Sequence, residues 1–232
     1  MSTLSATGSI CVALDSPDPS DVVAMADRLE GSVGMVKVGL TAFTAGGPWL
    51  VERLAAHKLF LDLKLHDIPD QVGGAVAAVD RLGVALTTVH AGGGRRMLAA
   101  AAEAAGPDLK VIAVTVLTSL DDADLSELGV RGGTGEAVLR LADIALEAGV
   151  GGLVCSPLEI AAVRERFGSY DDGGPYLVVP GIRPAGSQTH DQRRTLTPAE
   201  ALDAGADLLV VGRPITGADD PVAAARAIGE RG

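Results

Sequence analysis

Eight short apolar runs, each rich in β-branched residues, alternate along this chain with segments of helical periodicity. The runs are Ile10–Asp15, Val33–Gly39, Lys58–Leu65, Ala85–His90, Leu109–Thr118, Gly151–Ser156, Pro175–Ile182 and Asp207–Arg213. Near-continuous apolar runs are typical of parallel strands buried on both faces, and parallel neighbours need a crossover helix between them. Eight such units in 232 residues predict an α/β protein with the (β/α)8 architecture of a TIM barrel.

Proline at the start and glycine past the end mark several of the intervening helices. Helices are expected at Pro19–Leu29, Pro69–Leu82, Gly93–Ala105, Gly135–Ala148, Pro157–Phe167, Thr197–Ala204 and Pro221–Ile228. The alternative fold is an open, doubly wound sheet. It is disfavoured because the first run is followed by Asp15-Ser16-Pro17 and not by a Gly-x-Gly-x-x-Gly turn. We expect one domain over residues 1–232, a size that a single barrel commonly has.

The composition limits the kinds of partner that the chain can bind and the cellular compartment in which we expect it. A net charge of −11 argues against nucleic acid or an anionic membrane surface, because both attract positive fields. Cys11 and Cys155 lie inside apolar runs without metal-ligand spacing, which is typical of reduced core residues. The first residues lack the pattern of a signal peptide, and no apolar run reaches the ~20 residues of a membrane helix. We therefore expect a cytoplasmic protein.

The third apolar run carries charges that need an explanation. Asp62 and Lys64 are two residues apart, so a strand would place both side chains on one face, and Asp67 follows just before Pro69. Removing an ion from water costs several kcal/mol. Charged residues are therefore found in such a buried run only when they form ion pairs or take part in a reaction. One interpretation is a structural ion pair. The other is an active site, where opposed and desolvated charges serve chemistry.

Further charged and polar residues fall at the carboxyl ends of the other runs, where barrel enzymes place their chemistry. Each could singly be a cap or turn residue, but convergence on one rim favours a site. One group alternates in sign and predicts a reaction centre: Asp15, Lys37, Asp62, Lys64 and Asp67. A second group, Arg183 with Gly212-Arg213, predicts a phosphate anchor after the last two strands. The substrate expected is a small phosphorylated molecule.

These residues stand in motifs that are familiar as a set. From Ile10 to about Thr216 the chain resembles the bacterial type of the orotidine 5'-monophosphate decarboxylase family. The resemblance lies in Asp62-x-Lys64-x-x-Asp67-Ile68-Pro69, Ala13-Leu14-Asp15, Lys37-Val38-Gly39, Val89-His90-Ala91-Gly92-Gly93, Val116-Leu117-Thr118-Ser119, Val154-Cys155-Ser156, Pro180-Gly181-Ile182-Arg183-Pro184, Gln192-Arg193-Arg194 and Val211-Gly212-Arg213-Pro214.

The resemblance implies a lyase without cofactor or metal that converts orotidine 5'-monophosphate to uridine 5'-monophosphate and carbon dioxide. It implies that Lys64 protonates C6 of the pyrimidine, that Asp62 and Asp67 hold Lys64, and that Asp67 comes from the second subunit of a homodimer. The remaining residues that it implies bind substrate: Asp15 and Lys37 at the ribose, Thr118 and Ser119 at the base, and Gln192, Arg183, Gly212 and Arg213 at the phosphate.

The chain departs from the usual family pattern shortly after the third apolar run. The family usually has Thr two residues after the proline, whereas this chain has Gln71, so a ribose contact by Gln71 is only weakly implied. The segment Arg183–Leu196 is long and polar, and we interpret it as a lid over the phosphate.

Two alternative functions also remain: a magnesium-dependent enzyme like 3-keto-hexulose-phosphate synthase, which shares the Asp-x-Lys-x-x-Asp strand, and a nucleotide-binding barrel without activity.

Overall fold

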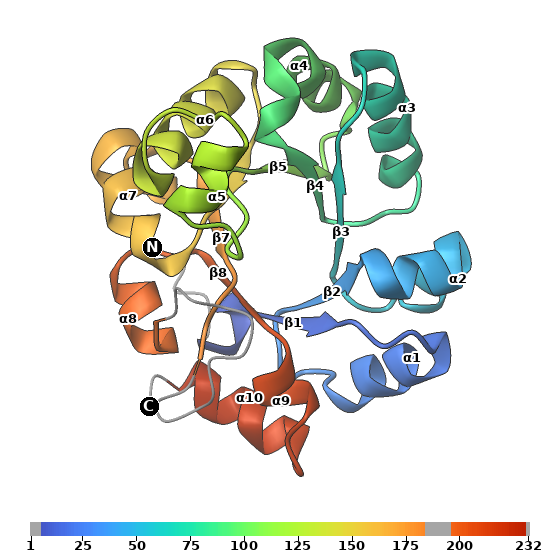
Figure 1. The fold of residues 1–232 in the computed structure, drawn as a ribbon. Helices are drawn as coiled ribbons and strands as arrows, with labels where there is room; N and C mark the ends of the chain where they lie inside the picture. Colours follow the sequence, from blue (N-terminus) through green and yellow to red (C-terminus); the bar gives the residue numbers. More distant parts are fainter. Residues whose placement is uncertain (1–5, 184–195, 231–232) are drawn as a thin grey trace.

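A computed structural model describes residues 6–183 and 196–230, and these form a closed barrel of eight parallel strands. The strands run in chain order around the barrel, and β8 pairs with β1 to close it (Figure 1). Their bounds are β1 Ile10–Leu14, β2 Met35–Gly39, β3 Leu59–Leu65, β4 Leu86–His90, β5 Lys110–Val114, β6 Gly152–Val154, β7 Tyr176–Val179 and β8 Leu208–Val211. The predicted TIM barrel is confirmed.

The α-helices surround the barrel on its outer side (Figure 1). Their bounds are α1 Pro19–Arg28, α2 Leu40–Arg53, α3 Pro69–Asp80, α4 Gly94–Ala104, α5 Asp122–Glu127, α6 Thr134–Glu147, α7 Ile160–Phe167, α8 Pro198–Asp203, α9 Arg213–Thr216 and α10 Pro221–Gly229. Short 3-10 turns lie at Ala6–Ser9, Ala91–Gly93, Pro157–Glu159 and Tyr170–Asp172. All seven helices expected from the sequence are present, with ends that differ by a few residues. None of the helices in the described ranges is both long and apolar enough to cross a membrane.

Helix α2 was not expected from the sequence. Its residues include Gly46-Gly47-Pro48, and Gly47 interrupts the helix with φ 58° and ψ −155°. Proline and an adjacent glycine with positive φ break the helical ladder, so the periodicity is split into two short pieces. The barrel nevertheless needs a crossover between β2 and β3, and the two pieces together supply it.

Four strands, β5 to β8, end at least two residues earlier than the apolar runs suggest. The fifth run was expected to extend to Thr118, but β5 ends at Val114, because its neighbour β6 offers partners only from Gly152 to Val154. Likewise β7 ends at Val179, and β8 ends at Val211, before the short helix α9. The apolar residues that follow these strand ends belong to buried parts of loops and not to the sheet. These loops carry the residues that reach over the barrel mouth.

The interior of the barrel is filled by side chains. This inner core comprises Cys11, Ala13, Met35, Phe60, Leu86, Ile112, Val178, Leu208 and Val210. A larger apolar cluster fills the layer between the strands and the helices. Both cysteines are buried, and neither forms a disulfide bond. Because the lumen is packed, a ligand has access only at an end of the barrel.

Candidate active site

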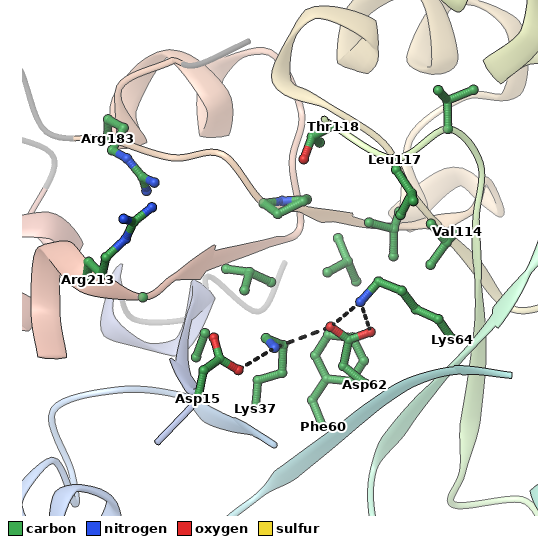
Figure 2. Close-up of a pocket in the computed structure, with 17 residues that line it drawn as sticks. Asp15, Lys37, Phe60, Asp62, Lys64, Val114, Leu117, Thr118, Arg183 and Arg213 are labelled. Atoms are coloured by element: carbon green, nitrogen blue, oxygen red, sulfur yellow. Dashed lines mark hydrogen bonds and ion pairs between the residues drawn. The ribbon is translucent and has the colours of Figure 1, made fainter. Parts of the chain in front are cut away.

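A cavity of about 300 Å³ lies at the carboxyl end of the barrel (Figure 2). It is lined by Ala13, Asp15, Lys37, Phe60, Asp62, Lys64, Val114, Val116, Leu117, Thr118, Val154, Val178, Pro180, Arg183, Val210, Gly212 and Arg213. These residues come from the ends of most strands and from the loops that follow them. Residues that lie far apart in the sequence therefore meet at one end of the barrel, as the predicted fold requires.

Strand β3 bulges at the point where it enters this cavity. Leu61 pairs with Thr87 and Leu65 pairs with Val89, so three residues of β3 lie opposite a single residue of β4. Lys64 sits in the bulge with φ 51°, and within the described residues it is the only non-glycine residue with positive φ. Such a backbone costs on the order of 1–3 kcal/mol and is kept where function needs it. The bulge aims the Lys64 side chain at Asp62.

Four side chains form a line of alternating charge across the cavity floor, which we name the charge chain: Asp15, Lys37, Asp62 and Lys64 (Figure 2). The Lys64 ammonium donates to both oxygens of Asp62 at 2.8 Å. The Lys37 ammonium lies 3.3 Å from Asp62 Oδ2 and 3.5 Å from Asp15 Oδ1. Gly39 leaves room for this arrangement, because a Cβ there would lie 2.8 Å from Asp15 Oδ1 and 3.0 Å from Lys37 Nζ.

Lys37 and Asp62, at the centre of the charge chain, stay ionised although they are buried. Burial alone would raise the pKa of Asp62, but Lys37 and Lys64 outweigh it, helped by hydrogen bonds from Lys64 and Thr88, so this pKa lies below its usual value. Burial alone would lower the pKa of Lys37, but Asp62 and Asp15 outweigh it and hold this pKa above its usual value. At neutral pH the Asp62 carboxylate and the Lys37 ammonium are therefore both charged.

Two guanidinium groups lie on another side of the cavity. Figure 2 shows the guanidinium groups of Arg183 and Arg213 pointing toward each other and separated from the charge chain. Arg213 begins α9 directly after Gly212, which caps that helix, and Arg183 also donates to the carbonyl of Ile182 at 2.9 Å. Paired guanidiniums suit an anion such as a phosphate. The position after the last two strands matches the expected anchor.

Only some of the other predicted site residues line the cavity of this chain. Asp67 and Gln71 are exposed and do not line the cavity, and Asp67 accepts a hydrogen bond from the backbone N–H of Ile68 at 2.6 Å. Thr118 lines the cavity, whereas the neighbouring Ser119 is exposed outside it. The expectation that one rim of a single chain gathers all five charged residues is therefore met by four of them. Gln192 and most of the expected lid lie outside the described residues.

The apolar wall of the cavity was not identified from the sequence. It is formed by Phe60, Val114, Val116, Leu117, Val154, Val178 and Val210. These residues look like ordinary core residues in the sequence, because nothing marks the last inward-facing position of a strand. The wall matters for chemistry, since apolar surroundings strengthen the interaction of the charge chain with any charge that develops nearby.

A TIM barrel with buried, opposed charges and a guanidinium pair at its carboxyl end defines an enzyme that acts on a small anionic molecule. Residues 8–228 match the family model described as "Orotidine 5'-phosphate decarboxylase / HUMPS family", and the chain belongs to this family. The resemblance deduced from the motifs is thereby confirmed.

Relatives and a solved structure agree with the family assignment. The chain is 53% identical over 221 residues to orotidine 5'-phosphate decarboxylase of Anaeromyxobacter sp. (strain K), covering 94% of this chain and 96% of the relative. It is 54% identical over 224 residues to the protein of the same name from Halorhodospira halophila, with 94% and 93% covered. The crystal structure of orotidine 5'-phosphate decarboxylase from Lactobacillus acidophilus superimposes with a TM-score of 0.84 at 37% identity, covering 96% of this chain and 97% of that chain.

Proposed function

We propose that this protein converts orotidine 5'-monophosphate to uridine 5'-monophosphate and carbon dioxide, the last step of pyrimidine nucleotide synthesis. The observation that carries the proposal is the Lys64 ammonium, held by both oxygens of Asp62 in a cavity that has an apolar wall. The family assignment and relatives that bear the decarboxylase name over nearly the whole chain support it.

The reaction requires a cation that is held beside one carbon of the pyrimidine ring. When the bond between C6 and the carboxylate breaks, carbon dioxide leaves and the electron pair stays in an sp² orbital at C6 that the ring cannot delocalise. An ammonium placed beside C6 stabilises this pair as it develops, and then donates its proton to C6. Lys64 takes this part, and Lys37 and Asp62 fix its position through the charge chain. Every step uses groups of the chain, and the mechanism requires no cofactor or metal.

The other cavity residues divide between the ribose, the base and the phosphate. Asp15 and Lys37 bind ribose hydroxyls, and Thr118 with Ser119 contacts the edge of the pyrimidine. The phosphate is bound by Arg213, Arg183 and Gly212, with Gln192 between phosphate and base. Binding energy from the phosphate then serves to hold C6 against Lys64, which is how a remote group raises the rate of a reaction.

The active unit in this proposal is a homodimer with shared sites. Asp67 lies outside the cavity of its own chain. The family resemblance implies that it acts on the site of the partner, where Gln71 contributes a weaker contact to the ribose. The surface next to Asp67 supports this arrangement: Ile68 is 63% exposed beside a groove lined by Asp67, Pro69, Gly92–Gly94 and Arg95–Met97.

The chain is further proposed to be a single domain of the cytoplasm that has no nucleic-acid partner. The two buried cysteines, which form no disulfide bond, support a reducing compartment, and the acidic composition disfavours polyanionic partners.

Turnover of orotidine 5'-monophosphate in the presence of EDTA tests the function. We expect loss of the substrate's ultraviolet absorbance, formation of uridine 5'-monophosphate, and the same rate with and without chelator. A rate that requires added magnesium would instead indicate the sugar-phosphate enzyme, and binding without turnover would indicate the inactive barrel.

The phosphate anchor gives a separate prediction. Arg213→Ala should weaken binding of uridine 5'-monophosphate by about 2–5 kcal/mol, because it removes one charged partner of the bound phosphate. Arg226 is an exposed arginine of α10 outside the cavity, so Arg226→Ala is the matched control and should bind normally. Calorimetric titration measures both. Equal affinity in the two variants would contradict the assignment of the anchor.

A further inference from the structure

The hydroxyl of Thr88, on β4, lies directly beneath the charge chain. Thr88 is fully buried and does not line the cavity. Its hydroxyl donates to Asp62 Oδ1 at 2.8 Å, and the backbone N–H of Lys64 donates to the same hydroxyl oxygen at 2.9 Å. A single side chain thus contacts both the carboxylate and the backbone of the residues that form the reactive pair.

The direction of these two hydrogen bonds is fixed by chemistry. An ionised carboxylate only accepts and a backbone N–H only donates, so the hydroxyl must donate to Asp62 and accept from Lys64. Serine and threonine are the aliphatic side chains that can do both from one oxygen. Valine has the shape of threonine but would leave the Lys64 N–H and one lone pair of Asp62 without this partner.

The β3 bulge explains why this hydroxyl is needed. Asp62, Leu63 and Lys64 lie opposite Thr88 alone, so β4 has too few backbone groups to pair with all of them in this region. The Lys64 N–H therefore bonds a side chain, in the one non-glycine residue of the described ranges with positive φ. A backbone in this sparsely populated region persists only when its surroundings hold it.

We propose that Thr88 is a positioning residue for the reaction: it fixes the bulged backbone of Lys64 and orients Asp62, and so fixes the place of the Lys64 ammonium in the cavity. The inference rests on the proposed decarboxylase function and deepens it. Thr88 does not touch substrate in this arrangement. Its loss should therefore affect the reaction step and leave ground-state nucleotide binding almost intact.

The adjacent residue provides a matched control. Thr87 is also fully buried, and its hydroxyl donates to the carbonyl of Leu61 at 3.0 Å. It thus bridges the same two strands without contacting the charge chain. Thr87→Val and Thr88→Val each remove one buried hydroxyl from the β3–β4 pair, so a merely structural role would make the two variants behave alike.

The experiment compares wild type, Thr88→Val, Thr88→Ser and Thr87→Val for kcat, KM, affinity for uridine 5'-monophosphate and Tm. We expect Thr88→Val to lower kcat by roughly 100-fold, the size of loss that a small misplacement of a reacting group produces. Its affinity for uridine 5'-monophosphate should stay within about twofold of wild type, because the binding groups are unchanged. Thr88→Ser should restore most of kcat. Thr87→Val should keep the wild-type kcat, although its Tm should fall as much as that of Thr88→Val.

Three results would overturn the proposal: a kcat of Thr88→Val near wild type, an equal loss in Thr87→Val, or a folded Thr88→Ser as slow as Thr88→Val. Wild-type enzyme without any turnover would instead remove the proposed function itself. The two failures are therefore distinguishable in one set of assays.

Discussion

Lys64→Ala should lower turnover of orotidine 5'-monophosphate by at least about four orders of magnitude. The substitution removes both the cation that stabilises the electron pair at C6 and the proton that C6 receives, and effects of each kind reach about 10²–10⁴-fold. It also leaves Asp62 with only Lys37 as an ammonium partner. The fold should remain, since the Lys64 side chain is 29% exposed and the barrel core does not include it.

Lys58→Ala is the matched control for this result. Lys58 is an exposed residue directly before β3, at the opposite end of the strand from Lys64. Turnover by single-turnover assay and folding by circular dichroism are compared in the two variants. Equal activity of Lys64→Ala and Lys58→Ala would refute the role assigned to Lys64.

Asp67→Ala should be almost inactive, although Asp67 lies outside the cavity of its own chain. Mixing it with inactive Lys64→Ala should restore activity, because the mixed dimer then has one site with both Lys64 and Asp67 intact. If subunits pair at random, half of the dimers are mixed, and we expect about a quarter of the wild-type rate per subunit at equal concentrations. The measurement is the rate after unfolding and joint refolding of the two variants.

A second mixture controls for simple stabilisation by a partner. Asp62 and Lys64 lie in one cavity of one chain, so Asp62→Ala mixed with Lys64→Ala produces no intact site and should stay inactive. Mixed dimers of Lys64→Ala and Asp67→Ala that form without regaining activity would show that sites are not shared.

Much of the fold follows from the sequence because its signal is repeated. Each βα unit carries an apolar run and a helical segment, so an error in one unit leaves the architecture unchanged. Helix α2 shows this, since Gly47-Pro48 hides it and the barrel is still predicted. Strand ends are less predictable. The residues around Thr118 are as apolar as a strand, and only the short β6 shows that pairing has stopped at Val114.

The candidate site is predictable where charge stands out against an apolar background. Asp62 and Lys64 are anomalous in a buried run, and strand periodicity correctly placed them on one face. The periodicity did not reveal the β3 bulge or the left-handed backbone of Lys64, because both depend on the register against β4. Thr88 was missed for the same reason. A threonine in a strand is common, and only its two partners distinguish it.

The most direct test of the account is a crystal structure with uridine 5'-monophosphate that carries a negatively charged oxygen on C6, since such a ligand imitates the charge of the transition state. We predict the Lys64 ammonium within hydrogen-bond distance of that oxygen, with the phosphate against Arg213. A ligand bound elsewhere, or a Lys64 side chain turned away from the ring, would contradict the account.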